Sequence, residues 1–372
     1  MAYLGEDIKK LGFGLMRLPM LDKEVDIEQT KKMVDIFIAN GFTYFDTAYG
    51  YIGGKSEMAV KTALVDRYPR ENFQLATKLP AWAGAKNADE AKNMFYTSLE
   101  RTGAGYFDFY LLHNLGGDRT EIFEHFGIWD FVHELRDKGL IKHLGFSFHD
   151  KADKLELVLK AHPEVEFVQL QINYADWEDD GVQSRKCYET ARKYGKPVII
   201  MEPIKGGSLA NLTENASAIF KEADPSASIA SWALRFAASL EGIVTVLSGM
   251  SNLSQMEENV KLMRNFSPLS DSERNTVKAV QSKLREIPQI PCTACGYCTK
   301  GCPSEINIPG VFKAMNNYLI YGNLEGAKGN YGWETRNGSP ASKCVECGQC
   351  ESVCPQHIKI IDELKKASAT LE

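Results

Sequence analysis

Residues 107–113 read FDFYLLH, a short run of almost continuously apolar residues that ends at a histidine. Strands covered on both faces have this composition, whereas a strand with one solvated face alternates apolar and polar residues. Seven further runs of the same kind occur in the first 285 residues. The eight expected strands lie at 11–18, 43–48, 74–79, 107–113, 143–148, 166–173, 197–203 and 242–249.

Helical patterns separate these runs. The segments DIEQTKKMVDIFIANG (26–41) and EHFGIWDFVHELRDKG (124–139) repeat apolar residues at three- and four-residue spacing, and both end at a glycine. Eight strand–helix pairs predict an α/β protein with a (β/α)8 TIM barrel. A doubly wound sheet is the alternative, but no Gly-x-Gly-x-x-Gly follows the first expected strand to support it.

Four polar residues stand where expected strands end. Asp46 lies near the end of the second strand and Tyr51 in the loop that follows, while Lys78 and His113 lie at the ends of the third and fourth. Each residue alone has a structural explanation: a loop cap, a rim aromatic, a solvated charge and a core histidine. Because the carboxyl ends of barrel strands meet at one rim, the four together indicate an active site.

This set of side chains suits the reduction of a carbonyl group. A phenol is a poor acid at neutral pH unless its anion is stabilised, which a neighbouring ammonium achieves. Tyr51 is therefore the expected proton donor, Lys78 adjusts it, Asp46 anchors Lys78, and His113 orients the carbonyl oxygen. The hydride has to come from a cofactor such as a nicotinamide, because no side chain supplies one.

The chain resembles the aldo/keto reductases in the segments GFTYFDTAYGYIGGKSE, ATKLP, FDFYLLH, LGFSFH and GMSNLSQMEENV. That family is a (β/α)8 barrel that reduces aldehydes and ketones with NAD(P)H, and its catalytic tetrad falls on the four residues above. The resemblance places the cofactor-binding positions at Ser147 and Gln171 for the nicotinamide carboxamide, at Met201, Gly249, Met250 and Gln255, and at Glu258 and Asn259 for the adenine end.

Two of these positions depart from the family. Met201 stands where the family stacks a tyrosine on the nicotinamide ring, and Gln255 stands where an arginine usually holds the 2′-phosphate of NADP. Because Arg is the residue suited to a phosphate fork, its replacement weakens the expectation of NADP over NAD. Another hydride carrier, such as a flavin, stays open.

The segments CTACGYCTKGCP (292–303) and CVECGQCESVCP (344–355) hold eight of the nine cysteines. Paired zinc sites and a disulfide framework are the alternatives, but neither explains three cysteines spaced two apart, then a fourth before proline, in duplicate. This spacing is typical of [4Fe–4S] ferredoxins with two clusters, whose ligation is crossed. We expect one cluster on Cys292, Cys295, Cys298 and Cys354, and the other on Cys344, Cys347, Cys350 and Cys302.

The ninth cysteine, Cys187, lies on an expected amphipathic helix and is interpreted as a packing residue. Two prolines in REIPQIPC mark a domain boundary, which predicts a barrel at 1–285 and a ferredoxin-like domain at 286–372. The segment INIPGVFKAMNNYLIYGNLEGAKG between the cysteine motifs is expected to be helical. The resemblance is thus to aldo/keto reductases that carry a C-terminal ferredoxin-type domain.

The overall charge excludes some partners. The 372-residue chain has 43 Lys and Arg against 49 Asp and Glu, for a formal net charge of −6. This provides neither a basic stripe for nucleic acid nor a polybasic membrane patch. The segment MAYLGEDIKKLGFG has no secretory signal pattern, and no apolar run is long enough to span a bilayer. A cytoplasmic protein without nucleic-acid or membrane partners is expected.

Three functions are compatible with these observations. In the first, the barrel reduces a small carbonyl compound while the clusters connect it to an electron-carrier protein of the ferredoxin or flavodoxin type. In the second, the enzyme depends on nicotinamide alone and its clusters are structural. In the third, an inactive barrel serves as a redox sensor or electron-transfer subunit, against which the intact tetrad argues. The loops 79–87, with Trp82, and 114–121 are expected to shape the substrate pocket.

Overall fold

The computed structural model describes Leu4 and residues 7–372. Contacts group the chain into two compact units, one formed by the residues up to Pro203 with Ala233–Leu269, the other by Ile204–Trp232 with Ser270–Glu372. The domain boundary expected between residues 285 and 286 stays a prediction. Within the described residues, the structure has no helix whose length and apolar character would let it cross a bilayer.

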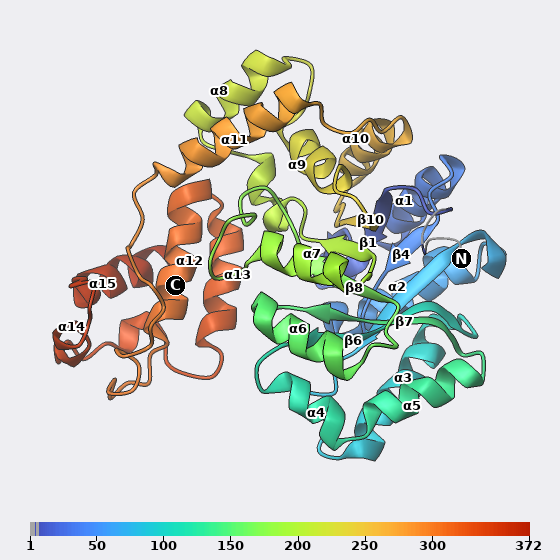
Figure 1. The fold of residues 1–372 in the computed structure, drawn as a ribbon, viewed down its shortest axis with the longest axis horizontal. Helices are drawn as coiled ribbons and strands as arrows, with labels where there is room; N and C mark the ends of the chain where they lie inside the picture. The colour runs from blue at the N-terminus through green and yellow to red at the C-terminus, as the bar shows by residue number, and fades with distance from the viewer. Residues whose placement is uncertain (1–3, 5–6) are drawn as a thin grey trace. The chain divides into compact units, whose positions relative to one another are not determined.

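Eight parallel strands close into a barrel in the order β1-β10-β9-β8-β7-β6-β5-β4 (Figure 1). All eight strands expected from the sequence are present. Their bounds are β1 Leu11–Gly14, β4 Tyr44–Asp46, β5 Gln74–Leu79, β6 Phe107–Leu115, β7 Ile141–Phe148, β8 Phe167–Gln171, β9 Val198–Met201 and β10 Ile243–Ser248. The first expected strand is shorter than predicted, because the chain turns into a 3-10 helix at Leu15–Arg17. A short antiparallel pair, β2 Met20–Leu21 and β3 Glu24–Val25, was not expected.

Buried side chains fill the interior of the barrel, as strands covered on both faces require. The interior cluster consists of Tyr44, Ala76, Phe109, Leu111, Phe167, Ile199, Val244 and Leu247. Glycine is needed where strands and rings approach closely: a Cβ at Gly145 would lie 2.5 Å from the carbonyl oxygen of Phe167 and 2.7 Å from its ring. This packing fixes the register that places polar residues at the carboxyl ends of the strands.

The helices that follow the strands are amphipathic and bury their apolar sides. Figure 1 shows α4 to α7 outside strands β6 to β8. The segment 124–139, expected as one helix, is two helices, because Gly127 adopts a left-handed φ of 59° between them. The helices up to residue 264 are α1 Ile27–Ala39, α2 Lys55–Val60, α3 Ala88–Thr102, α4 Arg119–His125, α5 Ile128–Asp137, α6 Ala152–Ala161, α7 Ser184–Lys193, α8 Glu214–Ala223, α9 Ile229–Ala238 and α10 Leu253–Arg264.

The C-terminal part of the chain is helical and has its own apolar core. Its helices are α11 Asp271–Arg285, α12 Ile308–Tyr321, α13 Leu324–Thr335, α14 Gln349–Ser352 and α15 Ile360–Leu371. The expected helical segment between the cysteine motifs is divided by Gly322, which has a φ of 65°, and Asn307 and Asn323 cap the two resulting helices. Helix α12 packs against α13 and α15 around a core that includes Val311, Phe312 and Leu364.

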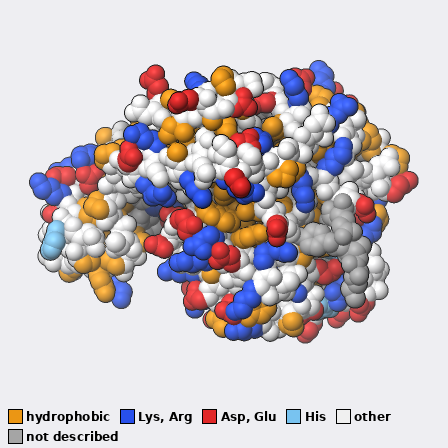
Figure 2. Space-filling model, turned by 45° about the horizontal axis from the view of Figure 1, so that its top comes forward, with side chains coloured by type: hydrophobic (Ala, Val, Ile, Leu, Met, Phe, Trp, Pro, Cys, Tyr) orange, Lys and Arg blue, Asp and Glu red, His pale blue; other side chains and the backbone are white. Residues whose placement is uncertain are grey.

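The surface carries charges of both signs. Figure 2 shows Lys and Arg interspersed with Asp and Glu over the face in view, in agreement with the modest net charge of −6. Cys187 is 4% exposed on α7, and burial raises the pKa of its thiol to about 12. This placement agrees with its interpretation as a packing residue.

Candidate functional site

The structure joins three of the four expected catalytic residues through Lys78, whose side chain is fully buried. Its ammonium nitrogen donates hydrogen bonds to Asp46 Oδ1 at 2.5 Å, to the carbonyl oxygen of Thr47 at 2.7 Å and to the Tyr51 hydroxyl at 3.2 Å. An ammonium with three acceptors has all of its donors satisfied, so it can be buried. The site therefore has a fixed positive charge beside a phenol.

The backbone places these residues by strand register and by one unusual loop. Asp46, the last residue of β4, pairs with Ala76 on β5, and Lys78 lies two residues further along β5 on the same face. After Tyr51 the chain makes a tight turn in which Ile52, Gly53 and Gly54 all have left-handed φ values, of 51°, 63° and 91°. The turn reverses the chain and directs Tyr51 toward Lys78.

His113 lies beside Tyr51 on the neighbouring strand β6. The two rings are 5.9 Å apart between centroids in an edge-to-face arrangement. Trp82, expected to shape the pocket, donates from its indole nitrogen to the backbone carbonyl of His113 at 2.7 Å. The buried Nδ1 atom of His113 has no hydrogen-bond partner among the described residues. The structure thus brings all four expected residues together and leaves an imidazole whose ring nitrogen is free to bind another group.

Two supporting residues were missed by the sequence analysis. Gln169 on β8 donates to the second carboxylate oxygen of Asp46 at 3.0 Å. Glu57, fully buried on α2, accepts from Thr77 at 2.7 Å and from Arg101 at 3.3 Å. Arg101 also binds the carbonyl oxygen of Tyr49 at 3.0 Å, in the loop that carries Tyr51. A period-two pattern in FVQLQ places Gln169 on the same face as Gln171, and that is the only sequence signal for it.

The surroundings of the four tetrad residues shift their pKa values. Burial alone would lower the pKa of Lys78, but the charges of Asp46 and Tyr51 outweigh burial and raise the pKa above its usual value. Burial raises the pKa of Asp46, and Lys78 only partly opposes the change. Burial also raises the pKa of Tyr51, against the effect of Lys78, with Glu202 adding to the rise. Burial, Lys78 and His149 hold the pKa of His113 well below its usual range, so the imidazole is neutral.

The residues expected to contact the nicotinamide lie at or near the ends of neighbouring strands. Ser147, 1% exposed near the end of β7, accepts a hydrogen bond from the backbone N–H of Asn114 at 2.8 Å. Gln171 ends β8 in register with Met201, which ends β9. The Gln171 amide donates to Asp176 at 2.9 Å, so a cofactor carboxamide would have to share or replace that contact.

The expected adenine-end residues gather at the end of β10 and on α10. Gly249 and Met250 directly follow β10. The Gln255 side chain accepts from the N–H of Ser251 at 2.8 Å, and Asn259, 6% exposed, donates to Ser248 at 3.0 Å. Glu258 is exposed on the same helix. Gln255 and Asn259 therefore hold this loop in place.

Arg17 contacts the same loop and was not predicted. Its side chain packs across Gly249, where a Cβ would lie 3.7 Å from Arg17 Cβ and 3.9 Å from its Cδ. Arg17 is exposed and follows β1, a neighbour of β10 in the barrel. Arg17 therefore adds a positively charged side chain beside Gly249, near the uncharged Gln255 of α10.

The eight cysteines of the repeated motif line two cavities. The first cysteine cavity is lined by Cys292, Cys295, Cys298 and Cys354 together with apolar residues that include Phe312 and Ile358. The second cysteine cavity is lined by Cys302, Cys344, Cys347 and Cys350 together with Ile306, Ile361 and Leu364. Ile308 lines both. This grouping of cysteines is the one expected for crossed ligation.

The thiols surround a volume and do not meet at a point. Across Leu4 and residues 7–372, no three His, Cys, Asp or Glu side chains converge as the ligands of one metal ion would. Burial raises the pKa of the Cys298 thiol to about 11, and it raises the pKa values of the Cys292 and Cys350 thiols as well. Such thiols lose their protons when iron binds them. An apolar cavity ringed by four thiols fits a cluster of several iron and sulfide ions.

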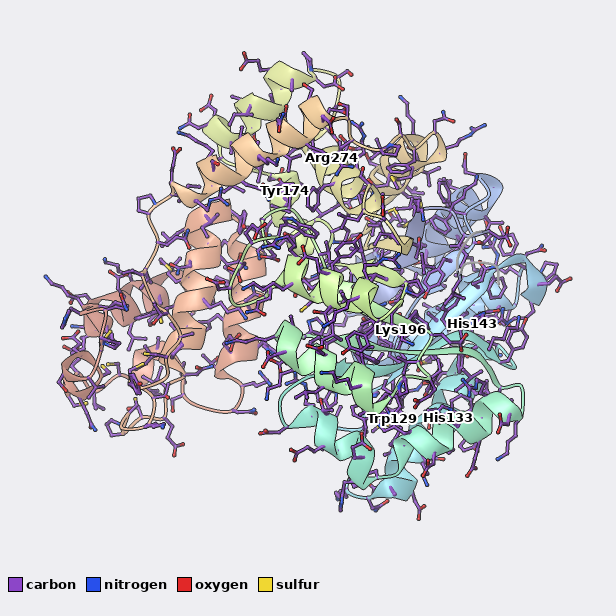
Figure 3. The ribbon with its side chains drawn as sticks, in the orientation of Figure 1. Trp129, His133, His143, Tyr174, Lys196 and Arg274 are labelled. Carbon is purple, nitrogen blue, oxygen red and sulfur yellow. The ribbon has the colours of Figure 1, made fainter. Side chains whose placement is uncertain are left out.

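Three other histidines, His133, His143 and His162, have structural partners near the opposite end of the barrel. His133 on α5 binds Glu164 at 3.2 Å, and His143 on β7 binds Glu166 at 2.7 Å. Trp129 stacks on the ring of His162 with 3.6 Å between centroids. Figure 3 labels His133, His143 and Trp129 in this region. Residues at the amino-terminal ends of barrel strands usually contribute to stability. These histidines therefore have a structural role, in contrast to His113 at the carboxyl end.

Comparisons with known proteins agree with this architecture. Residues 10–282 match the model of the aldo/keto reductase family, and residues 291–358 match that of a 4Fe-4S dicluster domain. An aldo-keto reductase from Mycolicibacterium smegmatis is 30% identical over 144 residues, 38% of this chain and 47% of that protein. The 3-alpha-hydroxysteroid dehydrogenase of Rattus norvegicus is 28% identical over 160 residues, 38% of this chain and 48% of that protein. The chain thus spans about half the length of these relatives.

Solved structures show the same fold. The aldo-keto reductase AKR11C1 from Bacillus halodurans superposes with a TM-score of 0.60 at 23% identity, covering 75% of this chain and 95% of that one. An aldo-keto reductase from Klebsiella pneumoniae, solved in complex with NADPH, has a TM-score of 0.58 at 21% identity and covers 76% and 96%. At these identities the likeness concerns the barrel fold.

Proposed function

Because the chain belongs to the aldo/keto reductase family and carries a 4Fe-4S dicluster domain, we propose that its barrel reduces the carbonyl group of a small molecule and that two clusters link this reaction to one-electron carriers. The contact of Lys78 with both Asp46 and Tyr51 carries the first part. The two four-cysteine cavities support the second.

The tetrad supplies the proton for carbonyl reduction. The nicotinamide supplies hydride to the carbonyl carbon when it is bound. Tyr51 donates its phenolic proton to the carbonyl oxygen, which yields the alcohol, and Lys78 stabilises the phenolate that remains, 3.2 Å away. Asp46 and Gln169 keep Lys78 in position. The neutral His113 holds the carbonyl oxygen through a hydrogen bond and adds no second positive charge.

Ser147, Gln171 and Met201 would hold the nicotinamide, since they end or lie near the ends of neighbouring strands β7, β8 and β9. Gly249, Met250, Gln255, Glu258 and Asn259 would hold the adenine end. Met201 offers a thioether in place of an aromatic ring, and Gln255 offers no charge to a 2′-phosphate. These departures favour NAD and NADP being accepted alike, and they keep a flavin as an alternative hydride carrier.

Two [4Fe–4S] clusters would occupy the cysteine cavities with crossed ligation. Each such cluster accepts and releases one electron at a time. Two clusters in one domain hold the two electrons that a hydride contains, so an electron-carrier protein of the ferredoxin or flavodoxin type is the proposed partner. A nicotinamide-only reductase with structural clusters is the second candidate, favoured by the NADPH complex of a protein with the same fold. The joined tetrad disfavours an inactive sensor.

Two variants of anaerobically purified protein test the proposal. Tyr51→Phe keeps the ring and removes the proton donor, so carbonyl turnover should fall by about 10²- to 10⁴-fold with iron content unchanged. Cys298→Ser should disturb the first cysteine cavity, abolish carrier-driven turnover and spare nicotinamide-driven turnover. Full activity in Tyr51→Phe would overturn the role of the barrel. If Cys298→Ser equals the parent with every electron donor, the clusters are structural.

A further inference from the structure

The two cysteine loops have nearly the same backbone. Ala294 and Glu346 occupy equivalent positions and have φ values of 55° and 56°, and Gly296 and Gly348 have φ values of 76° and 75°. The hydrogen bonds repeat as well: Cys302 N–H donates to the Thr299 carbonyl at 3.2 Å, and Cys354 N–H donates to the Glu351 carbonyl at 3.3 Å.

A repeated backbone presents the same set of N–H groups to both cavities. Hydrogen bonds to the sulfurs, net charge and solvent exposure set the reduction potential of an iron–sulfur cluster. Each cavity also has two partly buried, one exposed and one buried cysteine. Because these contributions match, the charges of nearby side chains decide whether the two clusters differ in reduction potential.

The loops differ in charge at the position after the third cysteine. Thr299 occupies it in the first loop, and its hydroxyl donates to the carbonyl oxygen of Gly296 at 2.7 Å. Glu351 occupies it in the second loop, and its carboxylate accepts from the backbone N–H of Ile361 at 2.9 Å. That hydrogen bond holds the carboxylate next to a wall of the second cysteine cavity, since Ile361 and Cys350 both line it.

The other acidic residue of the second cysteine loop has an ion-pair partner. Glu346 pairs with Lys365 at 2.8 Å, so its charge is largely neutralised locally. Glu351 has no ion pair with a described residue. In the first loop the positions equivalent to the two glutamates are Ala294 and Thr299, which are uncharged. The second cysteine loop therefore carries one carboxylate without an ion pair in the described part of the chain, whereas the first cysteine loop contains no Asp or Glu.

We propose that Glu351 makes the cluster in the second cysteine cavity the harder of the two to reduce, so that the first electron taken up resides in the first cysteine cavity. This inference rests on the proposed two-cluster content. A fixed negative charge opposes the addition of an electron nearby. The chain thereby gives direction to electron flow, from the cluster beside Glu351 to the cluster beside Thr299.

Redox titrations of the full chain, followed by electron paramagnetic resonance under anaerobic conditions, test the inference. Glu351→Gln keeps the acceptor for Ile361 and removes the charge, so the lower of two potentials should rise, with an about tenfold change in the reduction equilibrium, or about 59 mV. Thr299→Glu should lower the higher potential. The double variant Thr299→Glu with Glu351→Thr should reverse which cavity holds the cluster with the lower reduction potential.

Glu325→Gln is the matched control, because it removes one charge from a residue that lines neither cavity. It should leave both potentials unchanged. Iron and sulfide are measured first in each preparation. Zinc in place of iron and sulfide would overturn the proposed function and this inference with it. Full cluster content with parental potentials in Glu351→Gln, or equal potentials in the parent, would overturn this inference alone.

Discussion

The barrel site and the cysteine cavities achieve their arrangements by different means. In the barrel, Asp46, Lys78 and Gln169 come from three strands and already satisfy one another through hydrogen bonds. In the cavities, the thiols line apolar pockets, and burial raises the pKa values of the Cys292, Cys298 and Cys350 thiols. The barrel organises its polar groups by itself, whereas under the proposed function the cysteine loops are organised around iron–sulfur clusters. The two regions should therefore respond differently to loss of iron.

Removal of iron by a chelator should give the largest effect. The cavities would lose the bonds that hold the loops around them, and the apolar residues lining them would be exposed to water. We expect hydrogen-exchange protection to collapse across residues 292–303 and 344–355 and in α14, and to persist in β5 and β6. Mass spectrometry of exchanged peptides measures both regions in one sample. If the cysteine loops kept their hydrogen-exchange protection after complete iron removal, the proposal that they depend on iron would be wrong.

Gln169→Leu tests whether the barrel site depends on its own hydrogen bonds. The change leaves Asp46 Oδ2 without its 3.0 Å donor. Because a hydrogen bond to a charged group contributes about 1.5–3 kcal/mol, we expect kcat/KM to fall about 10- to 100-fold at 1.4 kcal/mol per decade. Gln74→Leu is the control, since Gln74 begins β5 and its Oε1 has no partner among the described residues. Equal losses in both variants would indicate general strand damage.

Cofactor preference should be small. Gln255 offers no positive charge to a 2′-phosphate, so NAD and NADP should bind within about tenfold of one another, or 1.4 kcal/mol. Titrations at matched salt measure the ratio. A hundredfold preference for NADP would show that another cation takes part, and Arg17→Ala would then identify it if the preference disappears.

Changing the pH should have the smallest effect, because kcat should not change across the neutral range. Reduction needs the protonated phenol of Tyr51, which persists until the pH rises through a pKa raised above 10.0. It also needs neutral His113, which becomes charged only when the pH falls through a pKa well below 6.5. kcat should therefore stay level between these limits. A step near the usual histidine pKa that His113→Asn abolishes would show that the imidazole is less shielded than its burial indicates.

The sequence predicted those features that are fixed by spacing or by strand ends. The cysteine pattern predicted which thiols share a cavity, because cluster geometry demands that spacing. Strand ends placed the tetrad because barrel strands are parallel. Gln169 and Glu57 were missed, because a glutamine on a strand and a glutamate on a helix have no sequence signature of their own. Gly127 and Gly322 were not recognised as breaks, because only their left-handed φ values distinguish them from other helix glycines.

Ile204–Trp232 was likewise not expected to group with the C-terminal residues. The segment follows β9 along the chain, and its association rests on tertiary contacts such as that of Asn323 with Ser208 at 3.3 Å. Contacts of this kind join residues far apart in sequence and leave no periodic pattern. They can be seen only once the fold is known.

The exchange of fourth cysteines between the cavities has a consequence for assembly. Cys354 lines the first cavity and Cys302 the second, so under the proposed ligation each half of the repeat would complete the other's ligand set. Filling one cavity fixes a residue from both halves and so removes much of the entropy that the second filling would otherwise have to overcome. Loading should then be cooperative: partially supplied protein should be a mixture of empty and fully loaded chains, with few that carry a single cluster.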